Sequence, residues 1–240
     1  MTVHYDSLAI NRNIRFDIPL REGVGIITQD IAKPHHPVAL VNAPAWTTLD
    51  SYLNCLTLDG ATEYLYSLNA DTGDLEPTTG DYSIGGWFFW QTGGSSQILI
   101  GRYQVDVGGW ELYLYDDGSN YYLTLRHHHS AGATTRTACY SGPWQKNMWH
   151  FVGISRSGVL ATFHKGDVLN GAAALVSTCA VGGLIDPEAT TSDLVIGARY
   201  TKNADFHKGM FWRWRYWGDR ALSLAEWQQI WEKEVEWFRS

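Results

Sequence analysis

Short runs in which apolar and polar residues alternate occupy most of the 240-residue chain. In residues 109–126, one tryptophan and four leucines alternate with tyrosine, threonine and charged residues, and an Asp-Gly turn divides the segment in two. Alternation with period two is typical of half-buried strands, and a turn of this kind between two such runs predicts a hairpin. Similar runs, separated by turns rich in glycine, proline and aspartate, recur between residues 51 and 217 without an intervening helical pattern. The pattern therefore predicts an antiparallel sandwich or barrel.

One helical pattern occurs, at the end of the chain. Ser223 and Glu226 have the spacing of a capping box, in which the serine hydroxyl accepts from the glutamate backbone N–H while the glutamate side chain reaches back. Apolar residues then return at helical spacing, which predicts a helix over about 223–238. Its tryptophan-rich face is expected to dock on the sandwich or on a neighbouring subunit. Residues 1–240 are predicted to form a single domain with an N-terminal arm over about 1–14.

The composition excludes several classes of protein. With 45% apolar, 18% charged and 14% aromatic residues, the chain is neither intrinsically disordered nor a coiled coil. The net charge is −7 and no run of lysine or arginine is present, so a phosphate-tracking nucleic-acid surface is not expected. The three widely spaced cysteines match neither a disulfide framework nor a metal ribbon.

Neither an export signal nor a membrane span is expected. Residues 1–30 carry charges, among them Asp6, Arg12 and Arg15, and no apolar core of signal-peptide type. A long uncharged stretch, residues 168–185, is too rich in glycine and polar residues to favour lipid.

Several segments, in their order and spacing, resemble the strands of laminin G-like domains, which are concanavalin A-like jelly rolls. The resemblance extends over about residues 15–231. It implies an all-β fold, a two-sheet antiparallel jelly-roll sandwich with a C-terminal α-helix. It implies less about function, because this fold is shared by lectins, glycosidases, adhesion modules and virion proteins. The segments that carry the resemblance are residues 55–64 (CLTLDGATEY), 82–87 (YSIGGW), 149–156 (WHFVGISR), 194–197 (LVIG), 206–209 (FHKG) and 219–226 (DRALSLAE).

The sequence does not predict an enzyme. Glucanases of this fold place their carboxylates on one strand as Glu-x-Asp-x-x-Glu, and no such run occurs. Asp186 and Glu188 have part of that spacing, but Pro187 between them marks a turn. The Gly-x-Ser-x-Gly motif of a nucleophile elbow is also missing. Glycoside hydrolase or lyase activity is therefore the least favoured interpretation.

A glycan-binding face is predicted on the polar side of the 109–126 hairpin. Aromatic rings beside hydrogen-bonding groups suit a sugar, whose C–H face stacks while its hydroxyls form hydrogen bonds. The alternative is that the tyrosines form cross-strand pairs that only stabilise a solvent-facing sheet. The predicted glycan-binding residues are Tyr113, Tyr115, Tyr122 and Arg126.

Two segments contain candidate metal ligands. Asn69, Asp71 and Asp74 supply oxygen atoms in a loop, as calcium requires, although an ordinary turn rich in Asp and Asn is the favoured interpretation. His127 and His129 would share one face of a strand, but no third ligand can be identified, and a solvated strand end is the simpler interpretation. No cofactor or metal is therefore assigned, and calcium is retained as a candidate.

Residues 211–217 (FWRWRYW) carry large aromatic side chains on both faces of a predicted strand. Strict alternation would place Trp212, Trp214 and Tyr216 on the same face. Either both faces are covered, one of them by the terminal helix, or one face meets a partner. Trp237 lies off the helical stripe and suggests a second contact. The interface candidates are Trp212, Arg213, Trp214, Arg215, Trp217 and Trp237.

These features favour a non-enzymatic structural or adhesion module of a virus particle, namely a capsid decoration or a tail or fibre surface protein of a phage. Such a protein is assembled in the host cytoplasm and displayed on the virion surface. Its partners would be other virion proteins or further copies of itself in a homo-oligomer. The alternative is a lectin-like carbohydrate-binding protein whose ligands are cell-surface glycans.

Overall fold

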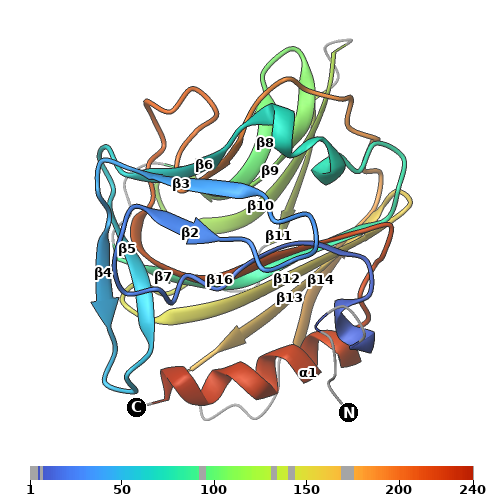
Figure 1. Cartoon of the computed structure of the whole chain (residues 1–240). Coiled ribbons are helices and arrows are strands. Elements are labelled where there is room, and N and C mark those ends of the chain that lie inside the picture. The colour runs from blue at the N-terminus through green and yellow to red at the C-terminus, as the bar shows by residue number, and fades with distance from the viewer. Residues whose placement is uncertain are drawn as a thin grey trace.

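Two antiparallel sheets pack face to face in the computed structural model (Figure 1). The structure describes Tyr5 and residues 8–91, 96–130, 134–139, 144–168 and 176–239. Within these residues, each sheet contains eight strands and every strand pair is antiparallel. The predicted all-β sandwich with a C-terminal helix is thereby confirmed. No described helix has the length and apolar character needed to cross a membrane.

The sheet next to the helix is called sheet A, and the other is called sheet B. Sheet A has the order β14-β13-β12-β7-β16-β5-β4, with β1 also paired to β16, and sheet B has the order β11-β10-β9-β8-β15-β6-β3-β2. The strands of sheet A are β1 (Ile14–Ile18), β4 (Ala45–Thr48), β5 (Asn54–Asp59), β7 (Tyr82–Trp90), β12 (Trp149–Ser157), β13 (Leu160–Asp167), β14 (Val176–Val181) and β16 (Lys208–Gly218). The strands of sheet B are β2 (Ile27–Gln29), β3 (Pro37–Val41), β6 (Tyr64–Ser67), β8 (Gln97–Gln104), β9 (Gly108–Asp116), β10 (Tyr121–His129), β11 (Thr134–Cys139) and β15 (Leu194–Ile196).

Apolar side chains from both sheets meet in a core between them. The predicted 109–126 hairpin forms as β9 and β10, with Tyr122 opposite Tyr115. The side chains that alternate toward the other sheet are buried, as the period-two pattern requires. These residues are Trp110, Leu112, Leu114, Leu123 and Leu125.

Helix α1 (Leu224–Glu234) and the following 3₁₀ segment η5 (Val235–Phe238) cover the outer face of sheet A (Figure 1). The predicted capping box is present: the Glu226 backbone N–H donates to Ser223 Oγ at 3.3 Å, and the Ser223 N–H donates to the Glu226 carboxylate at 2.8 Å. The helix buries a second apolar core against the sheet. That core includes Trp87, Phe151, Trp212, Trp217, Trp227, Ile230, Trp231 and Phe238.

Glycines in sheet A allow the helix to approach the strands closely. Gly85 of β7 and Gly153 of β12 are opposite each other, and the indole of Trp227 lies over both. A Cβ atom at Gly153 would lie 2.6 Å from the Trp227 ring, and one at Gly166 would lie 2.3 Å from Nε1 of Trp231. Real side-chain contacts do not become this short, so the two indoles occupy space that the side chain of any residue other than glycine would fill.

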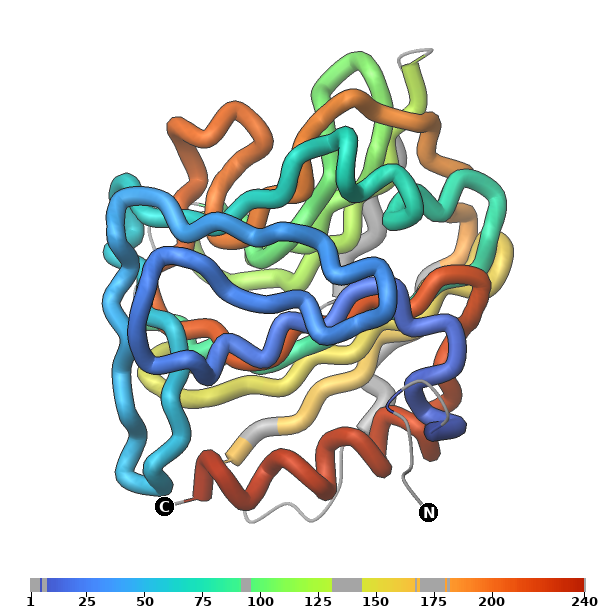
Figure 2. The backbone as a smooth tube through the Cα atoms, in the orientation of Figure 1, coloured from blue at the N-terminus to red at the C-terminus, as the bar shows by residue number. Residues whose placement is uncertain are grey.

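The N-terminal segment is fastened beside the start of helix α1 (Figure 2). Trp217 Nε1 donates to the Ile10 carbonyl at 2.8 Å, and Arg220 donates to the carbonyls of Ala9 and Arg12 at 2.9 and 2.8 Å. Arg220 also pairs with Glu226 of the helix. These bonds satisfy carbonyls outside the sheets and hold the segment at the edge of sheet A.

The strict alternation predicted for residues 211–217 is wrong beyond Trp212. A β-bulge lies between Trp212 and Arg215, where Arg213 adopts a left-handed backbone with φ of 45°. The extra residue shifts every later side chain to the opposite face. As a result Trp214 and Tyr216 join Phe211 in the core between the sheets, whereas Trp212 and Trp217 face the helix.

Replacing Gly153 with alanine is expected to lower the free energy of unfolding by about 1–3 kcal/mol, the usual cost of an extra methyl group in a filled contact. The added Cβ would displace Trp227 from the sheet. Urea unfolding followed by tryptophan fluorescence measures the change. Gly182→Ala is the matched control, because a Cβ there meets nothing within 4 Å. Equal unfolding midpoints for the two variants would contradict this account of helix docking.

Candidate functional site

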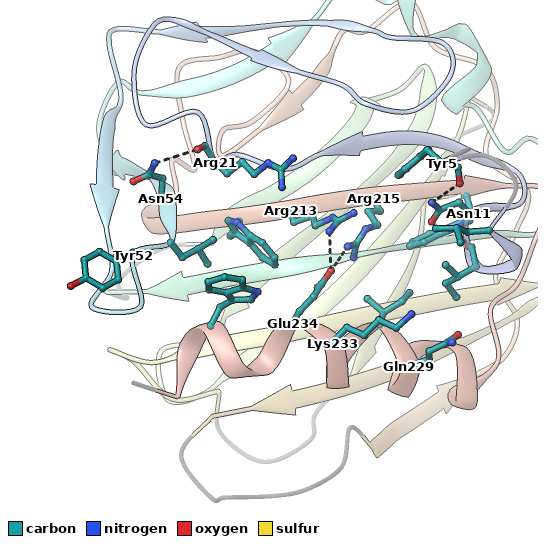
Figure 3. Close-up of a pocket in the computed structure, with 17 residues that line it drawn as sticks. Tyr5, Asn11, Arg21, Tyr52, Asn54, Arg213, Arg215, Gln229, Lys233 and Glu234 are labelled. Atoms are coloured by element: carbon teal, nitrogen blue, oxygen red, sulfur yellow. Dashed lines mark hydrogen bonds and ion pairs between the residues drawn. The ribbon is translucent and has the colours of Figure 1, made fainter. Parts of the chain in front are cut away.

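A pocket of about 480 Å³ opens where helix α1, strand β16 and the β4–β5 hairpin meet (Figure 3). The N-terminal segment closes one side, through Tyr5, Leu8 and Ile10. The wall contributed by the helix includes Ile230 and Glu234. Apolar and polar groups therefore line the same cavity, which is the usual composition of a small-molecule site.

A buried charge network forms the floor of this pocket. Asp17 of β1 is fully buried, accepts a hydrogen bond from the Tyr5 hydroxyl, and pairs with Arg213 Nη2 at 3.1 Å and Arg215 Nε at 3.4 Å. Glu234 of α1 pairs with Arg215 and with Arg213 Nη1 at 3.6 Å. Buried charges are tolerated only when they are paired, so these four charges hold the floor in one arrangement.

The ionisation states of the floor follow from this pairing. Burial alone would lower the pKa of Arg215, but Glu234 and Asp17 raise it above its ordinary value, so the guanidinium remains charged. Burial and the adjacent Asp17 carboxylate both raise the pKa of Tyr5. Tyr5 is therefore protonated and acts as a hydrogen-bond donor.

Two aromatic side chains stand at the rim of the pocket. Tyr52, in the β4–β5 turn, is 90% exposed and has a left-handed backbone with φ of 63°. Trp237 of η5 is 45% exposed. The Ser51 hydroxyl donates to the Trp237 carbonyl at 2.7 Å, which ties the hairpin tip to the end of the chain. The rim thus combines two accessible rings with a fixed connection between the segments that carry them.

The predicted interface residues fall largely in this pocket. Trp212, Arg213, Arg215, Trp217 and Trp237 line it. The aromatic face of β16 is covered by the chain's own helix: Trp217 meets Trp227 with ring centroids 5.4 Å apart. Of the two possibilities raised by the sequence, coverage by the terminal helix is therefore the one observed.

The prediction that Trp214 is an interface residue is wrong. It is completely buried between the sheets and stacks edge-on against Phe211. The β-bulge at Arg213 is the cause, because it turns the Trp214 side chain toward the core between the sheets.

The predicted glycan-binding face is partly engaged in its own contacts. Tyr113 is only 2% exposed, and the guanidinium of Arg126 lies 4.7 Å from its ring centroid and donates to its hydroxyl at 2.9 Å. Arg126 also pairs with Glu111 at 2.9 Å. Tyr113 therefore has no accessible ring face for a sugar. Tyr115 and Tyr122 remain at the surface as a cross-strand pair with centroids 6.4 Å apart.

The loop containing the calcium candidates does not gather its oxygens around a common point. It forms two 3₁₀ turns, η3 (Asn69–Asp71) and η4 (Gly73–Leu75). The Asn69 side-chain oxygen accepts from Arg102, and Asp74 Oδ1 pairs with His36 Nε2 at 2.8 Å. Among the described residues, no group of three His, Cys, Asp or Glu side chains could hold a metal ion. Asn69 and Asp74 of the predicted calcium set are therefore used for internal bonding.

The sequence predicts a solvated strand end at the three consecutive histidines, and this prediction is wrong for His127. His127 is buried between the Tyr82 hydroxyl and the Ile185 carbonyl, each 2.7 Å away. Burial lowers its pKa to about 4, so it is neutral near pH 7. His129 pairs with Glu188 at 2.9 Å.

Several pocket residues were not recognised from the sequence. Tyr52 and Asn54 belong to a short hairpin, and Arg21 follows β1 in an irregular segment. A bulky aromatic residue in a tight turn is the only local signal at Tyr52. Nothing in the sequence indicates that these segments meet helix α1.

No known protein family and no curated protein matches the sequence, but solved structures are similar. The binding domain of Paraclostridial Mosquitocidal Protein 1 has a TM-score of 0.69 at 12% identity, covering 92% of this chain and 52% of that one. The receptor binding domain of botulinum neurotoxin mosaic serotype C/D has a TM-score of 0.65 at 13% identity, covering 94% and 52%. Domain 4 of AbnA, a GH43 extracellular arabinanase from Geobacillus stearothermophilus, was solved with arabinotriose. It has a TM-score of 0.67 at 11% identity, covering 91% and 98%.

The chain has a concanavalin A-like fold. At these identities the comparisons show the fold alone. The chain spans about half the length of the two toxin binding domains and nearly the whole of the arabinanase domain.

The stability of the protein is expected to fall above neutral pH because of His36. This buried histidine lies between Asp30, 2.6 Å away, and Asp74, 2.8 Å away. Although burial lowers its pKa, the bonds to the two carboxylates prevail and raise it to about 9. A pKa raised by folding contributes stability that is complete below the unfolded value of about 6.5 and is lost as pH rises through 9.

Thermal unfolding of wild type and His36→Gln across pH 6 to 9.5 measures this contribution. The variant is expected to be less stable than wild type at pH 6, with the difference shrinking toward pH 9.5. His35→Gln, at an exposed neighbouring position, is the control and should not reproduce this dependence. A destabilisation by His36→Gln that is constant with pH would contradict the paired state.

Proposed function

We propose that this chain is a non-catalytic carbohydrate-binding module and that its sugar site is the pocket between helix α1, strand β16 and the β4–β5 hairpin. The observation that carries the proposal is the state of Tyr52. A large aromatic side chain that is 90% exposed gains little from folding, and its left-handed backbone costs energy. A strained and exposed ring at the rim of a pocket is explained by a role in binding.

The pocket has the two features that sugar recognition requires. Tyr52 and Trp237 present ring faces on which the C–H face of a sugar can stack. Arg213, Asn54 and Gln229 supply side-chain hydrogen-bonding groups for hydroxyls. The volume, about 480 Å³, lies within the roughly 300–1,000 Å³ of small-molecule sites.

The similar structures support a binding function. The arabinanase domain, similar over 98% of its own length, was solved in complex with arabinotriose. The two toxin structures are described as binding domains. Binding of a glycan or a glycan-bearing receptor is thus the function that these similarities favour for this chain.

The pocket chemistry also supports the absence of catalysis. Glycoside hydrolysis needs one carboxyl group that donates a proton and a second that acts as base or nucleophile. Glu234 lines the pocket and Asp17 lies behind its floor, and both are paired with arginines. Neither is arranged as a proton donor to a substrate.

Two sequence-based interpretations remain predictions. Tyr115 and Tyr122 form a second candidate surface on sheet B, since their rings remain at the surface as a cross-strand pair. Placement on a virion, with other virion proteins or further copies of this chain as partners, has no support from the toxin and arabinanase structures compared above.

Replacing Tyr52 with glycine is expected to weaken glycan binding without destabilising the fold. Glycine adopts the left-handed backbone at no steric cost, so the free energy of unfolding should stay within about 1 kcal/mol of wild type. Loss of the stacking ring should weaken affinity by about tenfold or more, roughly 1.4 kcal/mol. A broad glycan array identifies the ligand, and titration calorimetry with thermal unfolding compares the proteins.

Tyr122→Ala serves as the comparison variant for the sheet B surface and should bind glycans as wild type does. If Tyr122→Ala loses binding while Tyr52→Gly retains it, the sugar site lies on sheet B. If wild type binds no glycan at all, carbohydrate binding is rejected as the function.

A further inference from the structure

We infer that the glycan recognised by this pocket carries a carboxylate, as in a uronic acid residue of an acidic polysaccharide. The inference rests on the proposed function and specifies the class of sugar. It follows from the charges that line the pocket, from the arrangement of Arg213, and from an indole N–H that has no acceptor in the structure.

The pocket is positively charged although the chain as a whole is acidic. Four cationic side chains line the cavity, against one carboxylate in its lining, Glu234, and one behind its floor, Asp17. The net charge of the chain is −7. A local excess of two positive charges is therefore opposite in sign to the protein around it, and such a concavity concentrates anions. The four cations are Arg21, Arg213, Arg215 and Lys233.

The excess charge comes from Arg21 and Lys233. Both side chains are exposed, and within the described part of the chain neither is paired with a carboxylate. Figure 3 shows them on either side of the Arg213–Glu234 pair, one from the segment after β1 and the other from α1. Like charges that converge on one cavity without counter-ions do not help the chain to fold, but they attract an anionic ligand.

Arg213 is fixed in place between the two free cations. Its Nε and Nη2 atoms lie 3.3 and 3.1 Å from the Asp17 carboxylate, and Nη1 lies 3.6 Å from Glu234. The left-handed bulge that carries it re-aims the side chain, which is 26% exposed in the pocket. A guanidinium held in advance loses little entropy when its remaining N–H donors meet a carboxylate.

An independent observation comes from Trp212. This pocket-lining residue is only 4% exposed, and its indole Nε1–H has no hydrogen-bond acceptor among the described residues. The same holds for Trp144, Trp214 and Trp231, but those three do not line the pocket. The indole N–H is a donor only, and buried donors in folded proteins are nearly always paired. An acceptor oxygen from a bound ligand would complete the bond. The Trp212 indole N–H and the cations Arg21 and Lys233 line the same cavity. Together they favour a ligand that has hydrogen-bond acceptors and a negative charge.

Binding to uronic-acid polysaccharides and to their carboxyl-reduced forms tests the inference. Reduction converts each carboxylate to an alcohol and leaves the sugar backbone in place. Wild type is expected to bind the acidic form at least tenfold more tightly at low ionic strength, and this preference should shrink as salt is added. A sulfated galactan is included as a second anionic probe and should bind more weakly than the carboxylated polymer.

Three variants show whether the preference arises in this pocket. In Arg21→Gln/Lys233→Gln, the preference for the acidic form is expected to fall by about tenfold. Lys33→Gln/Lys208→Gln removes the same charge at exposed positions outside the pocket and should keep the preference. Trp212→Phe retains a ring but removes the N–H, and should weaken binding of the acidic form several-fold. Because Trp212 packs in the second core, the smaller ring is expected to lower the melting temperature, so binding is measured at a temperature at which the variant is folded.

The outcomes separate this inference from the proposed function. Equal affinity for the acidic and carboxyl-reduced forms overturns the acidic-sugar assignment and leaves carbohydrate binding intact. Tighter binding of the sulfated galactan than of the carboxylated polymer overturns the carboxylate assignment. Equal losses in the two double variants overturn the role of the pocket cations. Binding to none of these polymers or to any array glycan rejects the proposed function itself.

Discussion

The contact between helix α1 and the outer face of sheet A determines the geometry of both the fold and the pocket. Because Gly85 and Gly153 have no side chains, Trp227 lies directly on the strands. At this close approach Glu234 reaches Arg215 and accepts from Trp87 Nε1 at 2.9 Å. A helix held further from the sheet would break the buried Arg215–Glu234 pair and leave Arg215 with Asp17 alone, and breaking a buried pair costs about 3–5 kcal/mol. Apolar packing and charge pairing therefore require the same helix position.

The same contact fixes the pocket before any ligand arrives. One wall belongs to the helix and its 3₁₀ extension, and the floor belongs to β16 and β1. The hydrogen bond from Ser51 to the Trp237 carbonyl connects the β4–β5 hairpin to the end of the helical segment. A site whose walls are joined in this way loses little conformational entropy on binding, which favours affinity for ligands as polar as sugars.

Local patterns in the sequence were sufficient for the architecture but not for the pocket. The alternation in residues 109–126 and the capping box at Ser223 each act within a few residues, and the structure agrees with both. Arg213 in the bulge pairs with Asp17, which is 196 positions away, and alternation alone carries no sign of such a contact. The cavity likewise combines five separate stretches of the chain. Its walls arise from tertiary packing and have no local signature.

The two aromatic surfaces differ in how far their rings are exposed, and this difference favours the helix-side pocket. On sheet B, Tyr113 is only 2% exposed, and Arg126 bonds both to its hydroxyl and to Glu111. Buried polar atoms without a partner among the described residues occur on this sheet as well, at Arg126 Nε and Thr124 Oγ1, so they do not distinguish the two surfaces. The helix-side pocket retains a buried indole donor on Trp212 and an exposed ring on strained backbone at Tyr52. The exposed and strained Tyr52 ring is the feature that folding alone does not explain, and a ligand bound at the rim explains it.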